Sequence, residues 1–474
     1  MFELNQNLPI EVKLLRRHLN SKYAAIVLVF SLVTAILITL RPLLVPYVPN
    51  QFRRPIPLWL FSTISVGILL ICSFLQTQND YIFLTKRLGK LSVTVLPFLI
   101  LLALKPSILP DSYYLRLLPF HVWLGRIFIG FSTFHGILYL NYFYRVGKFF
   151  KAFQLLNFFG IIATASFFFT LIVSLHYFRS CIYETFYRCH LILSWISIII
   201  IGFHARPSMW FVVGVTLVLM AWQMIYRFAY GVTTTIQIDR VSDSAQIVTL
   251  PRHLFSSYFA PGSHIRISHT HDTSPYFLIS ASHPYSVASL SSDEKHIKLV
   301  VRPSKNFHLY ENALYRIHGP YPSIPNEFFL TSLKADAIPR RFLIIAGGVG
   351  ISFAAPVFKT LKQLGENVKG IWAARSKSEL RLFQELELND WDAYVDANAS
   401  EDDSPGSDMV YCQKNNIRVF FCRLNIASEL DSIAKMSDPK ALWIISCGSP
   451  SLVKESERIG RSIGATVFSE IYDI

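Results

Sequence analysis

The sequence predicts a multi-domain protein: an α-helical membrane bundle of about seven spans, then an antiparallel β-barrel, then an α/β domain with a parallel sheet. Three observations predict this order. The chain has 474 residues, of which 52% are hydrophobic and 14% aromatic, so it is too apolar for an ordinary soluble protein and too long for one domain. Apolar runs of about 17 residues or more, long enough to cross a bilayer, continue as far as Phe228. From Gly231 onward the pattern is that of a soluble α/β protein.

Seven apolar segments are predicted to be membrane spans. They cover approximately residues 23–40, 59–75, 91–105, 117–140, 155–176, 183–203 and 208–228. Residues 1–22 are assigned to an N-terminal tail, and 23–230 to the membrane domain. If the soluble half is cytosolic, seven spans place the basic tail and the loop with Lys86, Arg87 and Lys90 on the far side of the membrane. Since this contradicts the usual positive-inside bias, we expect that one segment is not a span or that the bias is overridden.

The net charge of +14 does not indicate nucleic-acid binding. Many of the basic residues border apolar segments, where lysine and arginine contact lipid headgroups, so the expected partner is membrane lipid. The first apolar run is followed by Arg41-Pro42 rather than by a small-residue cleavage site, which favours an uncleaved span over a signal peptide. The six cysteines show neither a CxxC metal pattern nor a disulfide framework.

The soluble half changes its pattern once. The segments "TTTIQI", "AQIVTLP", "HIRIS", "YFLIS" and "HIKLVVRP" alternate polar and apolar residues between turn residues, which predicts an antiparallel barrel over 231–337. "RFLIIAGGVGIS" then begins a strand–turn–helix unit, and "VKGIWAARS", "IRVFFCRL" and "ALWIISCGSPS" continue the alternation of strands and helices. This predicts a parallel sheet over 338–474, with an acidic loop at about 390–410.

Four histidines lie in the apolar segments at matched spacings. His121 and His135 are 14 residues apart, and so are His190 and His204. Fourteen residues make nearly four full helical turns, so both members of a pair face the same way, roughly 21 Å apart along the axis. A single histidine in such a segment could simply hydrogen-bond to a neighbouring helix. Four at matched spacings indicate a function, because ionisable groups inside a membrane are costly.

The two histidine-bearing segments are predicted to run parallel, because one span separates them. His121 then faces His190 at one depth, and His135 faces His204 at the other. Neutral imidazole is a common axial ligand of haem iron. The sequence therefore predicts two stacked haems that form an electron path across the bilayer.

The stretches "FHVWLGR" with "FHG", and "YRCH" with "GFHAR", resemble the haem helices of the ferric reductase/NADPH oxidase superfamily, in its fungal metalloreductase branch. The resemblance extends over nearly the whole chain. It implies a transmembrane flavocytochrome that passes electrons from NADPH through FAD and two b-type haems to an acceptor across the membrane, without catalytic side chains. It also implies that the soluble half is similar to ferredoxin–NADP reductases, with an FAD-binding barrel followed by an NADP-binding domain.

The tetrapeptide His283-Pro284-Tyr285-Ser286 resembles the family's flavin-binding His-Pro-Phe-Thr. A strand end punctuated by proline would look the same. The resemblance implies that Tyr285 packs on the flavin ring and that Ser286 donates a hydrogen bond to it. The family's glycine-rich pyrophosphate turn is replaced by "VRPSKNFHLYENAL", in which Arg302 and Lys305 could offset the phosphate charge.

The stretch "IIAGGVGIS" resembles the family's nucleotide turn. Its expected cofactor-binding residues are Gly347, Gly348, Gly350, Ile351 and Ser352. Glycines let the backbone approach a pyrophosphate, and the N-terminus of the following helix attracts its negative charge.

Two further strand ends are implied to contact the nucleotide. Arg375 could bind an adenosine 2′-phosphate, which favours NADPH over NADH, although it could also be an ordinary surface arginine. Cys447 and Gly448 match the family's cysteine–glycine pair near the nicotinamide. The family commonly ends in an aromatic ring over the flavin, whereas this chain ends in Ile474, and Tyr472 could take that role.

The acceptor predicted from the resemblance is a metal ion, Fe(III) or Cu(II), or its chelate. The 14-residue interval on both helices, and Tyr139 four residues after His135, favour a metal ion over dioxygen. One alternative is an NADPH oxidase that produces superoxide. The other is a haem-binding redox sensor or assembly subunit with little turnover. A multi-pass protein of the plasma membrane or endoplasmic reticulum is expected, with its soluble domains in the cytosol. Protein partners are not predicted.

Overall fold

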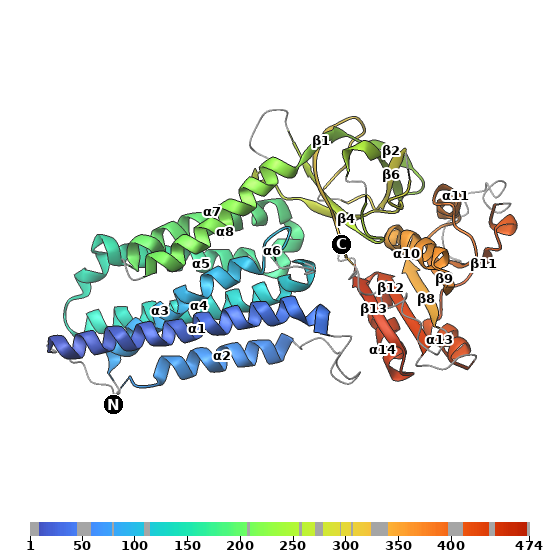
Figure 1. Ribbon diagram of the computed structural model, residues 1–474. Helices are drawn as coiled ribbons and strands as arrows, with labels where there is room; N and C mark the ends of the chain where they lie inside the picture. Colours follow the sequence, from blue (N-terminus) through green and yellow to red (C-terminus); the bar gives the residue numbers. More distant parts are fainter. Residues whose placement is uncertain are drawn as a thin grey trace. The chain divides into compact units, whose positions relative to one another are not determined.

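The computed structural model shows two compact units (Figure 1). It describes residues 9–44, 58–77, 80–108, 114–205, 209–255, 258–270, 278–293, 295–304, 307–323, 340–396, 411–435 and 441–471. The first unit contains Met1–Tyr230 and the short segment Leu278–Ala281, and the second contains Gly231–Phe277 and Ser282–Ile474. The predicted domain boundary at 337 falls outside the described residues, so the four predicted domain ranges stay predictions.

The first unit is a bundle of helices. Its elements are α1 (Ile10–Leu44), α2 (Leu58–Phe74), α3 (Tyr81–Leu101), α4 (Tyr114–Arg145), the 3₁₀ helix η3 (Phe149–Phe153), α5 (Leu155–Val173), α6 (His176–Cys181), α7 (Tyr183–His204) and α8 (Trp210–Tyr230). Five of these, namely α1, α4, α5, α7 and α8, are long and apolar enough to cross a membrane. The chain is therefore a membrane protein, while the number seven stays a prediction.

Two helices differ from the predicted spans. Helix α1 begins at Ile10, inside the segment predicted as a tail, and α3 begins at Tyr81 rather than near residue 91. The earlier start of α3 brings Lys86, Arg87 and Lys90 into a helix that was expected to start after them. Apolar periodicity alone did not reveal this, because it does not show that the charge of Arg87 is accommodated inside the bundle.

Arg87 shows how these charges are accommodated. Its side chain is fully buried, and its Nε donates to Asn20 Oδ1 of α1 at 2.9 Å. Its Nη1 donates to the Cys72 and Leu75 carbonyls at the end of α2. The guanidinium also lies 4.6 Å from the centre of the Tyr23 ring, a favourable cation–π contact. One arginine therefore ties α1, α2 and α3 together.

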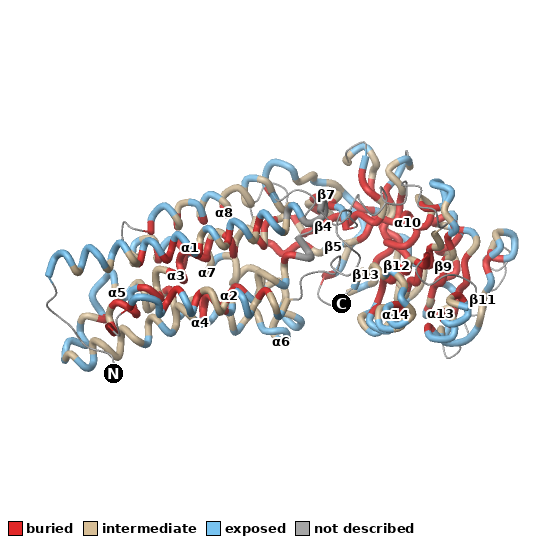
Figure 2. The backbone as a smooth tube through the Cα atoms, turned by 60° about the horizontal axis from the view of Figure 1, so that its bottom comes forward, coloured by how far each residue is buried: buried red, intermediate tan, exposed pale blue. Residues whose placement is uncertain are grey.

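Large apolar side chains point outward along the helices of the bundle. Examples are Phe134, Phe168, Ile199 and Val218, which are 44–67% exposed. Figure 2 shows the contrast: the helices carry long exposed and half-exposed stretches, whereas the strands of the second unit are mostly buried. An apolar surface of this extent is suited to hydrocarbon rather than water.

The first part of the second unit consists of two antiparallel sheets. One has the order β1 (Val232–Thr235), β7 (Leu314–Tyr321), β4 (His264–His269) and β5 (His283–Ser286), and the other has the order β2 (Gln237–Arg240), β3 (Gln246–Pro251) and β6 (His296–Val301). Both sheets line one apolar core that includes Val248, Ile265 and Leu299. A bridge between Val287 and Leu299 joins them. The antiparallel pairing agrees with the sequence, and closure into a barrel stays a prediction.

The strand expected in "YFLIS" is wrong for its described part. Residues 278–280 are not extended, and the strand near this position is β5, which begins at His283. The physical reason is that the backbone of Leu278–Ala281 bonds to side chains of α7 and α8 instead of to a neighbouring strand.

The parallel sheet predicted for the C-terminal part is confirmed. It has six strands in the order β11 (Arg418–Phe420), β10 (Trp391–Val395), β9 (Asn367–Ala374), β8 (Arg341–Gly347), β12 (Leu442–Gly448) and β13 (Thr466–Ile471), all parallel. The helices around it are α10 (Ile351–Gln363), α11 (Arg381–Glu385), α13 (Ile426–Lys435) and α14 (Pro450–Ser462). Separate apolar clusters cover the two faces of the sheet, as expected for a doubly wound domain.

The acidic loop predicted at about 390–410 is partly a strand. Residues 391–395 form the buried strand β10, and 397–410 lie outside the described residues. Asp392, an apparent loop residue in the sequence, is buried and paired with Arg418 and Lys369, each at 2.6 Å. Its charge is neutralised within the sheet, which the local acidic composition concealed.

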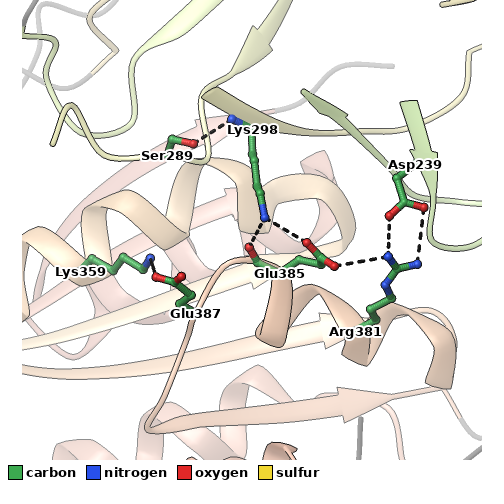
Figure 3. A network of polar contacts seen from close by, with 7 residues as sticks. All are labelled: Asp239, Ser289, Lys298, Lys359, Arg381, Glu385 and Glu387. Atoms are coloured by element: carbon green, nitrogen blue, oxygen red, sulfur yellow. Dashed lines mark hydrogen bonds and ion pairs between the residues drawn. The ribbon is translucent and has the colours of Figure 1, made fainter. Parts of the chain in front are cut away.

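A polar network joins the antiparallel sheets to the parallel-sheet domain within the second unit (Figure 3). Lys298 of β6 pairs with Glu385 of α11 at 3.0 Å. Arg381 of α11 pairs with Asp239 of β2 at 2.5 Å and with Glu385 at 3.3 Å. We call these four residues the α11 network. They tie α11 to both β2 and β6.

Candidate functional site

The structure brings the four histidines together in the two predicted couples. His121 of α4 and His190 of α7 have ring centroids 6.1 Å apart. His135 and His204, further along the same two helices, have ring centroids 6.3 Å apart. The inner couple below means His121 with His190, and the outer couple means His135 with His204.

The separations fit one metal ion between the rings of each couple. Metal–imidazole bonds are about 2 Å long, and the centre of each ring lies one ring radius beyond the ligating nitrogen. Two imidazoles on opposite sides of one ion therefore have centroids about 6 Å apart, as both couples do. Among the described residues no cluster of three or more His, Cys, Asp or Glu side chains is found, but axial ligation of haem needs only two.

Hydrogen bonds set the tautomer of each ring in the outer couple. His135 Nδ1 lies 2.7 Å from Thr85 O, and His204 Nδ1 lies 2.7 Å from Leu156 O. A carbonyl only accepts, so each Nδ1 carries the hydrogen. Each Nε2 then keeps its lone pair, the form that binds a metal.

The inner couple has the same arrangement. His121 Nδ1 donates to Leu99 O at 2.9 Å. His190 Nδ1 lies 3.3 Å from Ser174 Oγ, and this hydroxyl already donates to Thr170 O at 2.6 Å. Ser174 Oγ must therefore accept from His190 Nδ1. All four Nε2 atoms are left as lone-pair donors, so the residues fit two bis-histidine haems.

Two glycines make room for the outer couple, and sequence analysis missed both. A Cβ on Gly89 of α3 would lie 2.5 Å from the His135 ring, and a Cβ on Gly160 of α5 would lie 2.5 Å from the His204 ring. Each ring bonds to the carbonyl four residues before its glycine, Thr85 or Leu156. A lone glycine inside an apolar helix was the available signal.

The expected flavin tetrapeptide forms strand β5, paired with β4. Pro284 is exposed, Tyr285 is half-buried and Ser286 is buried. The His283 ring stacks on Phe307, with centroids 4.1 Å apart. Burial, assisted by the nearby Arg266 guanidinium and His269, lowers the pKa of His283 to about 4, so this ring is neutral at pH 7. Burial raises the pKa of the Tyr285 hydroxyl, and Tyr315 adds to the effect.

Arg266 is a buried cation beside the tetrapeptide that the sequence did not single out. Its Nε donates to Ser282 Oγ at 2.8 Å, and its Nη2 donates to Ser282 O. Of the two cations proposed to offset phosphate charge, Lys305 lies outside the described residues. Arg302 is half-buried just after β6. Burial and the neighbouring Arg375 lower its pKa, while Glu379 opposes the shift.

The predicted nucleotide turn and the Cys447–Gly448 pair pack directly against each other. They end β8 and β12, which are neighbours in the sheet. A Cβ on Gly350 would lie 2.8 Å from Cys447 O. Gly448, at φ +138°, lies so close to β8 that a Cβ on it would be 3.0 Å from Gly347 O. The crevice beyond the carboxyl ends of such strands is where α/β domains bind nucleotides.

Neighbouring side chains hold this turn. Trp372 Nε1 donates to Gly348 O at 2.9 Å. The fully buried Cys447 thiol donates to Gly350 O at 3.3 Å. Burial raises the pKa of that thiol well above its usual range, with Glu470 adding to the effect, so the Cys447 thiol is protonated at pH 7.

Ser352 links the predicted nucleotide turn to β5. It follows the buried Ile351 at the start of α10. Its Oγ donates to Ser286 O at 2.7 Å and accepts from Val300 N at 3.0 Å. The residue predicted to act at the nucleotide therefore also braces β5.

Arg375 is exposed at the end of β9, and its backbone is fixed by a buried carboxylate. Arg375 N donates to Glu379 Oε2 at 2.8 Å. The other oxygen of Glu379 accepts from the hydroxyls of Ser242 and Ser244. Glu379 was also missed by sequence analysis. Tyr472 lies outside the described residues.

Three family profiles match successive parts of the chain. A ferric reductase like transmembrane component matches residues 88–201, an FAD-binding domain matches 232–316, and a ferric reductase NAD binding domain matches 340–460. The first profile includes His121, His135 and His190 and ends just before His204. The last profile includes the glycine turn that follows β8.

Curated fungal proteins resemble the chain over most of its length. A probable metalloreductase AIM14 of Yarrowia lipolytica is 36% identical over 76% of this chain and 67% of that protein. One of Meyerozyma guilliermondii is 30% identical over 96% of this chain and 97% of that protein. Among solved structures, Amycolatopsis cytochrome P450 reductase GcoB aligns with 51% of this chain and 69% of its own, at 14% identity and a TM-score of 0.37.

Proposed function

The chain belongs to the fungal branch of the ferric reductase family, and from this premise we propose that it is a transmembrane flavocytochrome. It carries electrons from NADPH through FAD and two b-type haems to Fe(III) or Cu(II) on the other side of the membrane. The family makes it a membrane-bound oxidoreductase with FAD- and NAD(P)-binding domains. The haems, the direction of transfer and the metal acceptor are the proposal.

The observation that carries the proposal is the state of the four imidazoles. Each couple has the separation that one iron requires. Every Nδ1 is hydrogen-bonded and every Nε2 is free to ligate. A ring that merely joined two helices would need no partner ring about 6 Å away.

The chain's own groups bind and orient. When bound, FAD converts a two-electron donor into single-electron steps and the haems relay those electrons. The histidines hold iron, and the glycines of the outer couple let two rings reach it. Neutral His283 and the hydrogen-bonded strand β5 give the flavin a fixed surface beside the Arg266 guanidinium. The backbone N–H groups of the β8–α10 turn are available to a pyrophosphate. No described side chain has to move a proton.

The nucleotide is proposed to be NADPH. Arg375 is exposed at the carboxyl end of β9, the neighbour of β8. Its guanidinium is near enough to Arg302 to lower the pKa of that residue. Two neighbouring guanidinium groups, after β6 and after β9, suit an adenosine 2′-phosphate. The soluble domains are proposed to be cytosolic, where NADPH is available, in a protein of the plasma membrane or endoplasmic reticulum.

Turnover in purified membranes tests the function. With NADPH and an Fe(III) chelate, we expect reduction that persists when superoxide dismutase is added. Replacing any one of the four histidines by alanine should abolish it. His176→Ala is the matched control, because His176 is an exposed histidine of the same unit outside both couples. If dismutase abolishes iron reduction, superoxide is the product and the metalloreductase proposal fails.

A further inference from the structure

A four-residue segment of the soluble sequence belongs to the membrane unit. Leu278–Ala281 lies between β4 and β5 in the sequence, and the residues on both sides of it belong to the second unit. Ser282 follows directly, and His283 then begins β5. Whatever holds this segment therefore holds the chain two residues from the first expected flavin contact.

Arg227 of α8 holds the carbonyls of the segment. Its side chain is buried, with the residue only 6% exposed. Nη1 donates to Leu278 O at 2.7 Å and Nη2 donates to Ser280 O at 2.9 Å, while Nη1 also donates to Tyr187 Oη at 3.1 Å. One planar guanidinium thus bonds two carbonyls two residues apart, a geometry that the single ammonium of lysine reproduces poorly.

Glu184 of α7 holds the amide of the same segment. Its Oε1 accepts from Ala281 N at 3.2 Å. Arg188, one turn further along α7, donates to that oxygen at 2.8 Å and 3.0 Å and keeps it in place. His190 is only six residues after Glu184 on this helix. The helix that carries a ligand of the inner couple therefore also grips the segment.

The next residue is held from the second unit. Ser282 accepts from Arg266 through both its hydroxyl and its carbonyl. Side chains of the first unit therefore hydrogen-bond the backbone as far as Ala281. Arg266 bonds the next residue, Ser282, and β5 begins one residue later. Strand pairing does not supply these bonds in Leu278–Ala281, so the side chains are the anchor.

We propose that Arg227 and Glu184 are positioning residues that hold Leu278–Ala281, the segment that leads into β5, on α8 and α7 of the first unit. The role rests on the proposed function, because it matters only if flavin binds at β5 and haem at the inner couple. The anchor acts through the backbone of Leu278–Ala281, two residues before His283, without touching flavin or haem.

Hydrogen exchange of the full-length protein in nanodiscs tests the anchor directly. We expect the Ala281 amide to exchange roughly tenfold faster in Arg227→Gln and Glu184→Ala, because charge-assisted hydrogen bonds are lost. Arg227→Lys should give an intermediate rate. Arg145→Gln, which removes an exposed cation at the end of α4, should leave the rate unchanged. An unchanged rate in both Arg227→Gln and Glu184→Ala overturns the anchor.

Two further measurements separate positioning from folding and from the function itself. Haem absorbance and NADPH-driven reduction of ferricyanide, a soluble acceptor, should stay at wild-type levels in Arg227→Lys and Glu184→Ala. Reduction of haem by NADPH should slow at least about tenfold in Glu184→Ala. Faster exchange with unchanged haem reduction overturns the positioning role. A wild-type protein without haem absorbance overturns the proposed function, while the exchange result still judges the anchor.

Discussion

At the scale of single residues, the outer couple depends on two glycines that have no Cβ atom. Gly89 and Gly160 lack the Cβ that would lie 2.5 Å from the rings of His135 and His204. The missing methyl group lets each ring reach the carbonyl one helical turn earlier. The outer couple therefore needs four helices, α3, α4, α5 and α7, to approach closely at two defined points.

Alanine at either glycine should remove the outer haem. In Gly89→Ala or Gly160→Ala the new methyl group displaces an imidazole, so we expect about half of the haem per protein, measured by pyridine haemochrome absorbance. Gly130→Ala on α4 is the control, because a Cβ there meets nothing within 4 Å. Full haem content in both Gly89→Ala and Gly160→Ala would contradict the role given to these glycines.

His283 should make the soluble half sensitive to acid. Its pKa is about 4 in the folded protein and near 6.5 when unfolded. The unfolded chain binds the extra proton between these values, so stability is complete above pH 6.5 and falls as the pH drops toward 4. The loss is up to about 3 kcal/mol.

Hydrogen-exchange protection in β4 and β5, corrected for intrinsic rates at each pH, measures this loss. His283→Gln should flatten the profile between pH 4 and 6.5. His296→Gln at the exposed start of β6 should preserve it. A profile that is equally steep without His283 would assign the acid sensitivity elsewhere.

At the scale of elements, α11 is fixed mainly by charge. The α11 network joins it to β2 and β6 through Arg381, Asp239, Glu385 and Lys298 (Figure 3). These side chains are 28–49% exposed, so each pair contributes little alone. Together they set the place of the residues that follow Arg375.

Arg381→Ala should lower the opening free energy of α11 by about 1 kcal/mol, since exposed pairs contribute up to roughly that amount. High salt should reduce the difference, because it screens exposed charges. Hydrogen exchange of α11 at low and high salt measures both effects. Lys435→Ala, which breaks the exposed Lys435–Asp431 pair on α13, should not alter α11. A salt-independent loss would indicate packing rather than charge.

Sequence patterns predicted these elements unevenly, for physical reasons. Long apolar runs predict helices, and strands followed by glycine turns are recognised from the local sequence. The alternation of strands and helices predicted the parallel sheet, and the matched spacings predicted the pairing of the histidines. The start of α3 was not predicted, because the buried Arg87 donates a hydrogen bond to Asn20 of α1, a helix distant in the sequence. Residues 278–280 read as a strand, but their hydrogen bonds come from α7 and α8. Hydrogen-bond partners that are distant in the sequence do not change the local periodicity of apolar residues, so the pattern cannot reveal them.

At the scale of the whole molecule, membrane and soluble halves are separate in composition but not in chain order. The apolar helices end at Tyr230, and the sheets begin at Val232. Composition marks that junction clearly. It gives no sign that four later residues return to the helical unit, since a guanidinium and a carboxylate hold them by the backbone, where side-chain identity counts for little.

The backbone crosses from one unit to the other three times, before Gly231, before Leu278 and before Ser282. A protease cut or a recombinant fragment beginning at residue 231 consequently does not release an intact reductase half. It separates Leu278–Ala281 from Arg227 and Glu184. The buried guanidinium of Arg227 then loses two of its hydrogen-bond acceptors, the carbonyls of Leu278 and Ser280. A protein divided between Tyr230 and Gly231 should therefore give one fragment perturbed beside β5 and one in which Arg227 and Glu184 have lost these hydrogen bonds.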